Sequence, residues 1–228
     1  MINELLLISL LGGLVALDNT EAFQTMFSQP LVIGSLIGFI LGDLSGGLKI
    51  GILLQLMYLW VMPIGAATFP DSTVGSVVGS CGFIILSGLF PDRGNLILLV
   101  ILLFVLIFCL FSGWTLIKQR QLNSKLIPKA DLCAEKARIK GFNSLFFLGL
   151  SGSFFRGFMV TGLGILCIFV LLKPIVRLLD FIPEQYLQNI ELPIWGLGIG
   201  TMLNLFAKRR RPLLIISGMV LGIIFIWL

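Results

Sequence analysis

The sequence predicts an all-α integral membrane protein: a multi-span helical bundle with broken or reentrant hairpins and inverted repeats. Of its 228 residues, 57% are apolar and 12% are charged, and the mean hydropathy is +1.07, whereas about a quarter of a soluble domain is charged. The apolar runs are continuous and lack the alternation that marks barrel strands. Several runs are short and interrupted by glycine or proline, which is typical of backbone that lines a cavity inside a membrane. We expect one membrane domain over residues 1–228.

The composition also excludes several kinds of site. The chain contains no histidine, so it carries neither a catalytic imidazole nor a phosphohistidine. Its four cysteines are scattered singly and form no CxxC pair, so we expect no metal and no cofactor. Most basic residues lie in connections between apolar runs, a distribution that sets membrane orientation. The net charge of +5 therefore does not indicate nucleic-acid binding.

The first apolar run, Leu5–Leu17, is short for a full span of about 20 residues. The polar cluster Asp18–Glu21 follows and is expected to begin a new helix, with Phe23–Phe27 as a short interfacial helix. The start of the chain lacks the basic region of a signal peptide, so we expect no cleaved leader.

The stretch from Pro30 to Asp71 organises the rest of the chain. Two short apolar arms, Pro30–Leu41 and Leu48–Met62, are joined by a glycine-rich turn, so we expect a helical hairpin or a broken span. Small residues four apart share one helix face and allow close backbone approach. This face either packs against another helix or forms a binding surface where a ligand contacts the backbone directly. The glycines at this spacing are Gly34, Gly38, Gly42 and Gly46.

Two polar residues in this stretch are candidates for a binding site. Gln55 lies between two blocks of apolar residues, and Asp71 follows the Pro63-Ile64-Gly65 break. Polar groups in hydrocarbon cost several kcal/mol, roughly, so they persist where they have partners or water. A structural role and a role in binding are both open for each of them.

The next segments are expected to be ordinary helices. Thr73–Phe90 is rich in glycine and serine and should pack closely. A tight loop over Pro91–Asn95 leads into Leu96–Ile117, whose bulky apolar side chains predict a lipid-facing helix with only a scaffold role.

A basic loop over residues 118–143 is expected on the cytoplasmic side by the positive-inside rule. It holds seven Lys and Arg against Asp131 and Glu135. It is either a determinant of topology alone or a docking surface for a soluble partner.

The second half of the chain has one charged residue inside an apolar run and a segment whose pattern loosely resembles the hairpin. Arg156, within Leu145–Leu172, faces a cavity or snorkels from a helix end. Pro193 opens a glycine-rich arm that contains Asn204 and is followed by a basic block, as Pro30 opens the first arm. Such paired interrupted segments indicate inverted repeats around a midplane site. The remaining segments are an amphipathic connection (Lys173–Glu191), the basic block (Lys208–Arg211) and a final helix (Pro212–Leu228).

Residues 29–71 resemble the IIC membrane subunit of the mannose/sorbose family of bacterial sugar phosphotransferase systems (PTS). The matching elements are Gln29-Pro30-Leu31, the GFILGD of 38–43, Gly51–Leu56, and Pro63–Ala67 running to Pro70-Asp71. In the family these read approximately RPL, a glycine-rich helix ending LGD, G-x-T-L-E, N-I-G-A-A and P-D. Weaker similarity extends through the whole chain.

The resemblance implies a multi-pass subunit of the bacterial inner membrane that translocates sugar together with a second membrane subunit, IID, in a hetero-oligomer. It implies no enzyme activity on this chain, because soluble IIA and IIB carry the phosphoryl transfer. The sugar is expected to contact polar residues and a bare backbone stretch. The expected contacts are Gln55, Asp71, Asp18, Gly65, Ala66 and Asn204.

The chain departs from the family pattern at three positions: Gln55 stands where many members carry Glu, Gln29 replaces Arg, and Pro63 replaces Asn. Unlike ionised Glu, Gln both donates and accepts hydrogen bonds. An alternative is therefore a family-derived membrane sensor or anchor that docks soluble PTS components and transports little. A third possibility is an unrelated small-solute transporter.

Overall fold

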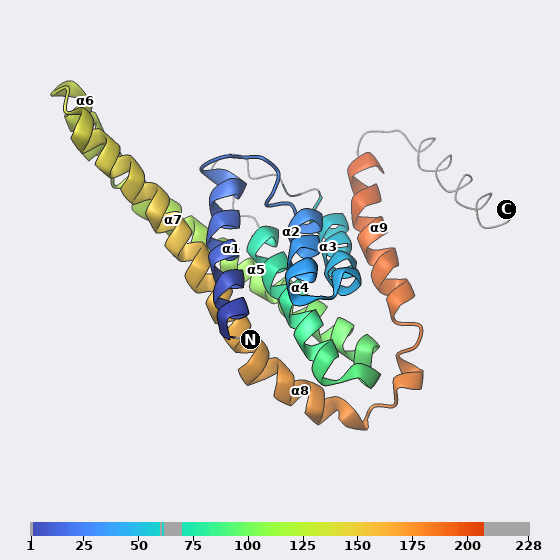
Figure 1. The fold of residues 1–228 in the computed structure, drawn as a ribbon. Coiled ribbons are helices and arrows are strands. Elements are labelled where there is room, and N and C mark those ends of the chain that lie inside the picture. The colour runs from blue at the N-terminus through green and yellow to red at the C-terminus, as the bar shows by residue number, and fades with distance from the viewer. Residues whose placement is uncertain (1, 60, 62–69, 208–228) are drawn as a thin grey trace.

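In a computed structural model, residues 2–59, 61 and 70–207 are described, and within these ranges the secondary structure is helical, with no strand. A bundle of helices carries a long two-helix arm on one side (Figure 1). Three stretches are long and apolar enough to cross a membrane: Ser72–Leu89, Pro91–Glu135 and Ile139–Phe181. The predicted all-α membrane bundle is confirmed.

Helix α1 (Ile2–Thr20) packs along α7 (Ile139–Cys167). Small residues permit this contact: a Cβ added at Gly157 would lie 2.6 Å from the Gly12 carbonyl oxygen and 3.0 Å from the Gly13 Cα. The cluster Asp18–Glu21 was expected to begin a helix, and this expectation is wrong: α1 runs through Asp18 and ends at Thr20.

Helices α2 (Pro30–Leu41) and α3 (Leu44–Tyr58) form the expected hairpin, and their 12 and 15 residues are too few for an ordinary crossing. Gly42 ends α2 with a φ of 80°, which favours glycine. Asp43 then caps α3, since its carboxylate accepts from the Gly46 N–H at 2.9 Å.

The glycines hold the hairpin closed. A Cβ added at Gly34 would lie 2.8 Å from both the carbonyl oxygen of Gly47 and the Cα of Gly51. The predicted line of four glycines is therefore split: Gly34 and Gly38 belong to α2, and Gly46 lies on α3, beyond the turn. Of the two expected roles, these contacts show helix packing.

Helix α4 (Ser72–Leu89) is the centre of the bundle, because every residue from Thr73 to Ile84 is buried. The turn at Pro91–Arg93 (η1) leads into α5 (Gly94–Ser124). The helix expected over Leu96–Ile117 is thus present, and it exposes Leu103, Ile107 and Leu110 on one side only, while its scaffold role stays a prediction. One side of α5 packs on α4 and α7 and buries, among others, Leu98, Ile101, Val105 and Cys109.

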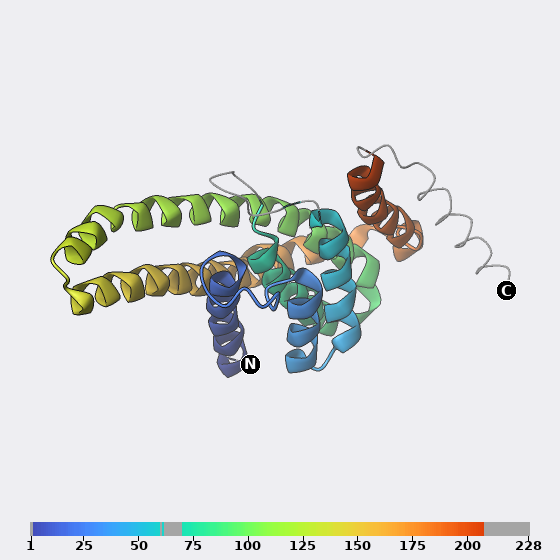
Figure 2. The same ribbon diagram turned by 90° about the horizontal axis from the view of Figure 1, so that it is seen from above.

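The expected basic loop over 118–143 is instead mostly helical. Helix α5 continues to Ser124, α6 spans Ile127–Glu135, and α7 begins at Ile139. Lys, Arg, Gln, Leu and Ala are all good helix formers, and Pro128 stands in the first turn of α6, where proline is tolerated. Figure 2 shows α5 and α7 running side by side to α6 at the far end of the arm.

After α7, the chain returns to the bundle, and its last described helix packs against the hairpin. Helix α7 passes through a π-helical turn, Ile168–Leu172 (η2), into α8 (Lys173–Leu178), and short turns at Leu179–Phe181 (η3) and Glu184–Tyr186 (η4) precede α9 (Glu191–Ala207). Helix α9 packs on α3. The basic block at 208–211 and the expected final helix lie outside the described residues, so the inverted repeat stays a prediction.

Candidate functional site

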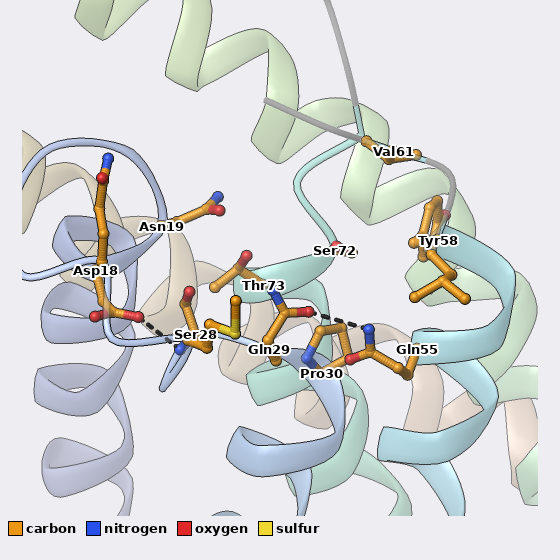
Figure 3. A pocket seen from close by; sticks show the side chains of 13 residues that line it. Asp18, Asn19, Ser28, Gln29, Pro30, Gln55, Tyr58, Val61, Ser72 and Thr73 are labelled. Carbon is orange, nitrogen blue, oxygen red and sulfur yellow. Dashed lines mark hydrogen bonds between the residues drawn. The ribbon is translucent and has the colours of Figure 1, made fainter. Parts of the chain in front are cut away.

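A cavity of about 410 Å³ lies where four helix ends meet: the ends of α1 and α3 and the beginnings of α2 and α4. Its walls carry carboxylate, amide and hydroxyl groups, and its size is within the range of small-ligand sites. Figure 3 shows it from close by. The described lining residues are Asp18, Asn19, Gln24, Met26, Ser28, Gln29, Pro30, Gln55, Tyr58, Leu59, Val61, Ser72 and Thr73.

Asp18 shapes one wall of this cavity by holding the loop between α1 and α2. Its Oδ1 accepts from the backbone N–H and the hydroxyl of Thr25, at 2.8 and 2.7 Å, and its Oδ2 accepts from the Ser28 N–H at 2.9 Å. The loop takes sharp turns, with positive φ at Phe23, Gln24 and Met26. The helix expected over Phe23–Phe27 is therefore absent.

Gln55 joins the two arms of the hairpin at the cavity. Its Nε2 donates to Oε1 of Gln29 at 3.0 Å (Figure 3). Its Oε1 accepts from the Leu31 backbone N–H at 3.4 Å. The Leu31 N–H lies in the first turn of α2, where helix donors lack an intrahelical partner. Each amide retains further donor and acceptor capacity for a ligand.

The structure brings two of the predicted site residues together. Asp18 from α1 and Gln55 from α3 line the same cavity, although 37 positions apart in the sequence. Asp71 is not among the lining residues, but its neighbours Ser72 and Thr73 are. Gly65 and Ala66 lie outside the described residues, as does the side chain of Asn204.

Asp71 lies in a buried polar cluster behind the cavity. Its Oδ1 accepts from the Val74 N–H at 3.3 Å and so caps α4. Its Oδ2 accepts from the Ser112 hydroxyl at 2.8 Å and from the two terminal nitrogens of Arg156 at 3.0 and 3.1 Å. The Asp71 backbone N–H donates to the Cys109 carbonyl at 2.9 Å. The cluster therefore ties the start of α4 to α5 and α7.

Sequence reasoning missed this cluster. Arg156 was expected to face a cavity or to snorkel, and it does neither: its side chain is 7% exposed and paired with a carboxylate that is fully buried. The signal was present, since Asp71 and Arg156 are lone opposite charges beside or within apolar runs, and such charges pair inside membranes. Ser112 carried no signal, because a serine is unremarkable in an apolar helix.

The cavity chemistry suits an uncharged, polyhydroxylated ligand. Asp18 is the one ionisable carboxylate among the described lining residues, and none of them is basic. Residues 60–69, which the structure leaves undescribed in large part, contain no charged side chain. Amides and hydroxyls donate as well as accept, so they match sugar hydroxyls in either role.

Comparison with known proteins gives the family. The model of EII-Sor, the PTS system sorbose-specific IIC component, matches residues 2–226. The chain belongs to the EII-Sor family. A sorbose-specific EIIC component of the PTS from Lacticaseibacillus casei is 28% identical over 224 residues, 96% of this chain and 76% of that protein. The mannose-specific EIIC component of Escherichia coli (strain K12) is 38% identical over 60 residues, 26% of this chain and 22% of that protein.

Three further matches are partial in sequence or show the fold alone. With a relative from Escherichia coli (strain K12) that carries the name of an N-acetylgalactosamine permease IIC component, the alignment spans 62% of that protein at 33% identity and 36% of this chain. Two solved structures, both 18% identical, cover all of this chain. One is described as a membrane protein (TM-score 0.71, 95% of that chain), and the other is the cryo-electron microscopy complex of mannose transporter ManYZ with microcin E492 (TM-score 0.58, 94% of that chain).

The EII-Sor family membership confirms the resemblance read from residues 29–71. It also gives a physical meaning to two departures from the family pattern. Gln29 and Gln55, which stand where the resemblance gives Arg and Glu, contact each other across the hairpin. In this chain the two positions therefore hold a neutral, hydrogen-bonded amide pair.

Proposed function

We propose that this chain is the sugar-translocating IIC subunit of a mannose/sorbose-type phosphotransferase system, acting with a IID subunit in the bacterial inner membrane. The observation that carries the proposal is the convergence of Asp18, Gln29 and Gln55 on one cavity at four helix ends. Family membership over residues 2–226 supports the transport role. The names of relatives supply the candidate sugars sorbose, mannose and N-acetylgalactosamine. A fourth, fructose, comes from the fructose permease IIC component of Bacillus subtilis (strain 168), which is 36% identical over 77 residues.

In this proposal the sugar hydroxyls bind the amides of Gln29 and Gln55 and the free acceptor capacity of Asp18. The hairpin arms α2 and α3 supply one side of the cavity, and the loop held by Asp18 supplies the other. Gly65, Ala66 and Asn204 remain proposed sugar contacts on the strength of the family resemblance. Asp71 serves as a positioning residue, because its cluster with Arg156 holds the start of α4, where Ser72 and Thr73 line the cavity.

Phosphoryl transfer belongs to soluble IIA and IIB partners in this proposal. The chain has no histidine to carry a phosphoryl group. The IID subunit would cover part of the apolar surface that the bundle leaves exposed, for example around Phe155 and Met159 on α7. The domain over residues 1–228 would then be one half of a hetero-oligomeric permease.

The second candidate function is a membrane sensor or anchor that docks soluble PTS components and transports little. The neutral Gln29–Gln55 pair favours it, because the pair removes two charges that the family pattern carries at the cavity. A sensor and a permease subunit can both bind sugar, but only the permease subunit is expected to support sugar uptake by cells.

A radiolabelled-uptake panel separates them. Cells that lack their own mannose-type system express this chain with its neighbouring IID, IIA and IIB, and uptake of the four sugars is measured. We expect uptake of one sugar, lost when this chain is omitted. Sugar binding by the purified complex without uptake of any sugar would support the sensor, and neither binding nor uptake would contradict both functions.

A further inference from the structure

The far end of the arm, around α6, holds an excess of positive charge that equals the net charge of the whole chain. Residues 118–140 contain seven basic and two acidic residues. This excess of five positive charges equals the formal net charge of the chain, +5, so the remaining residues are neutral in sum. Figure 1 and Figure 2 show the end of the arm well away from the bundle. We call residues 118–149, from α5 through α6 to the first turns of α7, the tip.

The tip also exposes large apolar side chains beside these charges. Ile139 is 73% exposed, Phe147 66% and Ile127 57%. Leu122, Leu132, Phe142, Phe146 and Leu148 are likewise exposed. Helix α6 buries none of its residues. Soluble surfaces rarely present so many apolar side chains together, so water is an unsuitable surrounding for this part of the arm.

One contact within α5 and one between α5 and α7 indicate that the tip lies at the edge of the membrane. On α5 the apolar run ends at Ile117, and Lys118 lies over the ring of Trp114 at 5.8 Å, a pairing typical of the membrane interface. Asn123 of α5 donates to the Gly149 carbonyl of α7 at 3.5 Å. The exposed phenylalanines of α7 before Gly149 therefore lie at the level of the lysines, beyond the apolar run of α5.

A groove of about 360 Å³ lies at the base of the tip, between its helices and Glu21, the residue that follows α1. It is predominantly apolar, and its polar lining residues are Glu21 and Asn123. Its apolar lining includes Leu126, Ile127, Phe142, Leu145 and Phe146. Basic residues flanked by exposed aromatic and aliphatic side chains are the combination that binds anionic membrane surfaces.

We propose that the tip lies in the headgroup region of the adjacent leaflet and binds anionic phospholipid. Its lysines and arginines contact the headgroups, and its exposed apolar side chains enter the acyl boundary. The exposed apolar side chains favour lipid over an acidic soluble protein, because the bilayer that holds α5 and α7 offers an acyl boundary and anionic headgroups side by side. The tip would then brace the arm against the membrane while the hairpin remains free to bind sugar.

The test measures the depth of a nitroxide at the tip of the full chain in vesicles. The label is placed at Leu132→Cys on α6, in a background with Cys133→Ser and Cys167→Ser, since Cys81 and Cys109 are buried and do not react. Vesicles contain phosphatidylcholine alone or mixed with phosphatidylglycerol. We expect the label in the mixed vesicles to be accessible to oxygen and protected from a water-soluble nickel complex. A label at Asp92→Cys, at the exposed η1 turn, serves as the water-facing reference.

A charge-neutralising pair identifies the headgroup contact. Lys129→Gln with Lys136→Gln should lower the ratio of inserted to water-exposed label roughly thirtyfold, since each basic residue near an anionic surface contributes on the order of a few-fold to tenfold in binding. The matched pair Lys173→Gln with Arg177→Gln, on α8 at the other end of α7, should leave the ratio unchanged. A label open to the nickel complex in mixed vesicles would overturn the proposal, as would insertion that ignores both lipid charge and the tip lysines. Protection that arises only when a soluble PTS component is added would assign the tip to protein docking instead.

Discussion

At the residue scale, polar side chains in this protein are stabilised by polar partners from other helices. Gln55 reaches across the hairpin to Gln29, and Asp71 pairs with Arg156 and Ser112. In an apolar surrounding an unpaired polar group costs far more than a paired one. Substitutions at these positions should therefore act through the partner that is left behind as well as through the lost group.

Gln55→Leu is expected to weaken sugar binding roughly tenfold or more, because a polar contact contributes about 0.5–1.5 kcal/mol and an unpaired hydroxyl adds to the loss. Gln55→Glu should retain binding, since Glu still accepts from the Leu31 N–H and Gln29 can turn its amide to donate. Ligand-induced thermal stabilisation of the purified complex measures both variants.

The Gln55→Leu result needs a control for folding, because the substitution also removes the tie between the hairpin arms. The thermal midpoint without ligand provides it. Gln29→Arg combined with Gln55→Glu should restore a partly exposed ion pair with a coupling of about 0.2–1 kcal/mol in a double-mutant cycle. Wild-type affinity of the Leu variant for every sugar would show that Gln55 has a structural role only.

Asp71→Ala is expected to destabilise the protein by about 3–5 kcal/mol, because it leaves the buried Arg156 guanidinium without its carboxylate. Removing both charges, with Asp71→Asn and Arg156→Gln, should destabilise it less, since no buried charge is left unpaired. Thermal unfolding in detergent measures both variants, and Asp92→Ala at the exposed η1 turn is the matched control. Equal destabilisation by the single and double variants would contradict a specific pair.

At the scale of the elements, the α2–α3 hairpin depends on glycine contacts between its arms. A Cβ added at Gly38 would lie 2.7 Å from the Asp43 carbonyl oxygen, closer than real Cβ atoms pack, and 3.1 Å from the Gly47 Cα, which is a tight contact. Gly42 has a different role: a Cβ there would meet nothing, but its φ of 80° disfavours other residues. The two glycines were expected to share one packing face. Gly38 is instead needed because a side chain has no room there, and Gly42 is needed because of its backbone conformation.

Gly38→Ala should open the hairpin and destabilise the protein by about 1–3 kcal/mol, the usual range for overpacking. Gly88→Ala is the matched control, because it lies near the end of α4 with no atom within 4 Å of an added Cβ. That variant should be neutral or stabilising by up to about 1 kcal/mol, since Ala is the better helix former. The thermal midpoints of the two variants in the same detergent measure this difference in stability. An unchanged midpoint for Gly38→Ala would mean that the two arms are not in contact.

At the scale of the whole molecule, charge sets the orientation. By the positive-inside rule, the basic tip is expected on the cytoplasmic side. Helix α5 connects the tip to the η1 turn at Pro91–Arg93, and its apolar run is long enough to span the membrane. The η1 turn should therefore face the outside, and the cavity, at the opposite end of α4 from η1, should open towards the cytoplasm.

Thiol labelling tests this orientation. Lys129→Cys should resist an impermeant reagent added to whole cells, and Asp92→Cys should react with it, in the Cys133→Ser, Cys167→Ser background. Lys129→Cys should become reactive when the cells are opened, which separates its cytoplasmic position from burial of the tip among lipid headgroups; both positions are exposed in the chain itself. Arg210→Cys, in the second basic block, should behave like Lys129→Cys. Labelling of Lys129→Cys from outside would reverse the orientation and would place the cavity on the outer face.

The sequence alone was sufficient for the membrane class, the family and the hairpin. These depend on local properties: apolar run length, glycine spacing and the turn at Gly42-Asp43, all of which are written in neighbouring residues. It was also sufficient to single out Gln55, because a polar residue between two apolar blocks stands out, whereas Asp18 was named from the family resemblance; sugar binding by either residue stays a prediction.

Only the tertiary structure decided which of these residues meet. The Asp71–Arg156 pair spans 85 positions and the cavity joins four helix ends, and no local pattern encodes which helix faces which. The same holds for the buried face of α5 and for the helical tip, where good helix formers outweighed the polar composition that suggested a loop. Periodicity states that a helix has an apolar face, but the partner of that face is set by how the whole bundle packs.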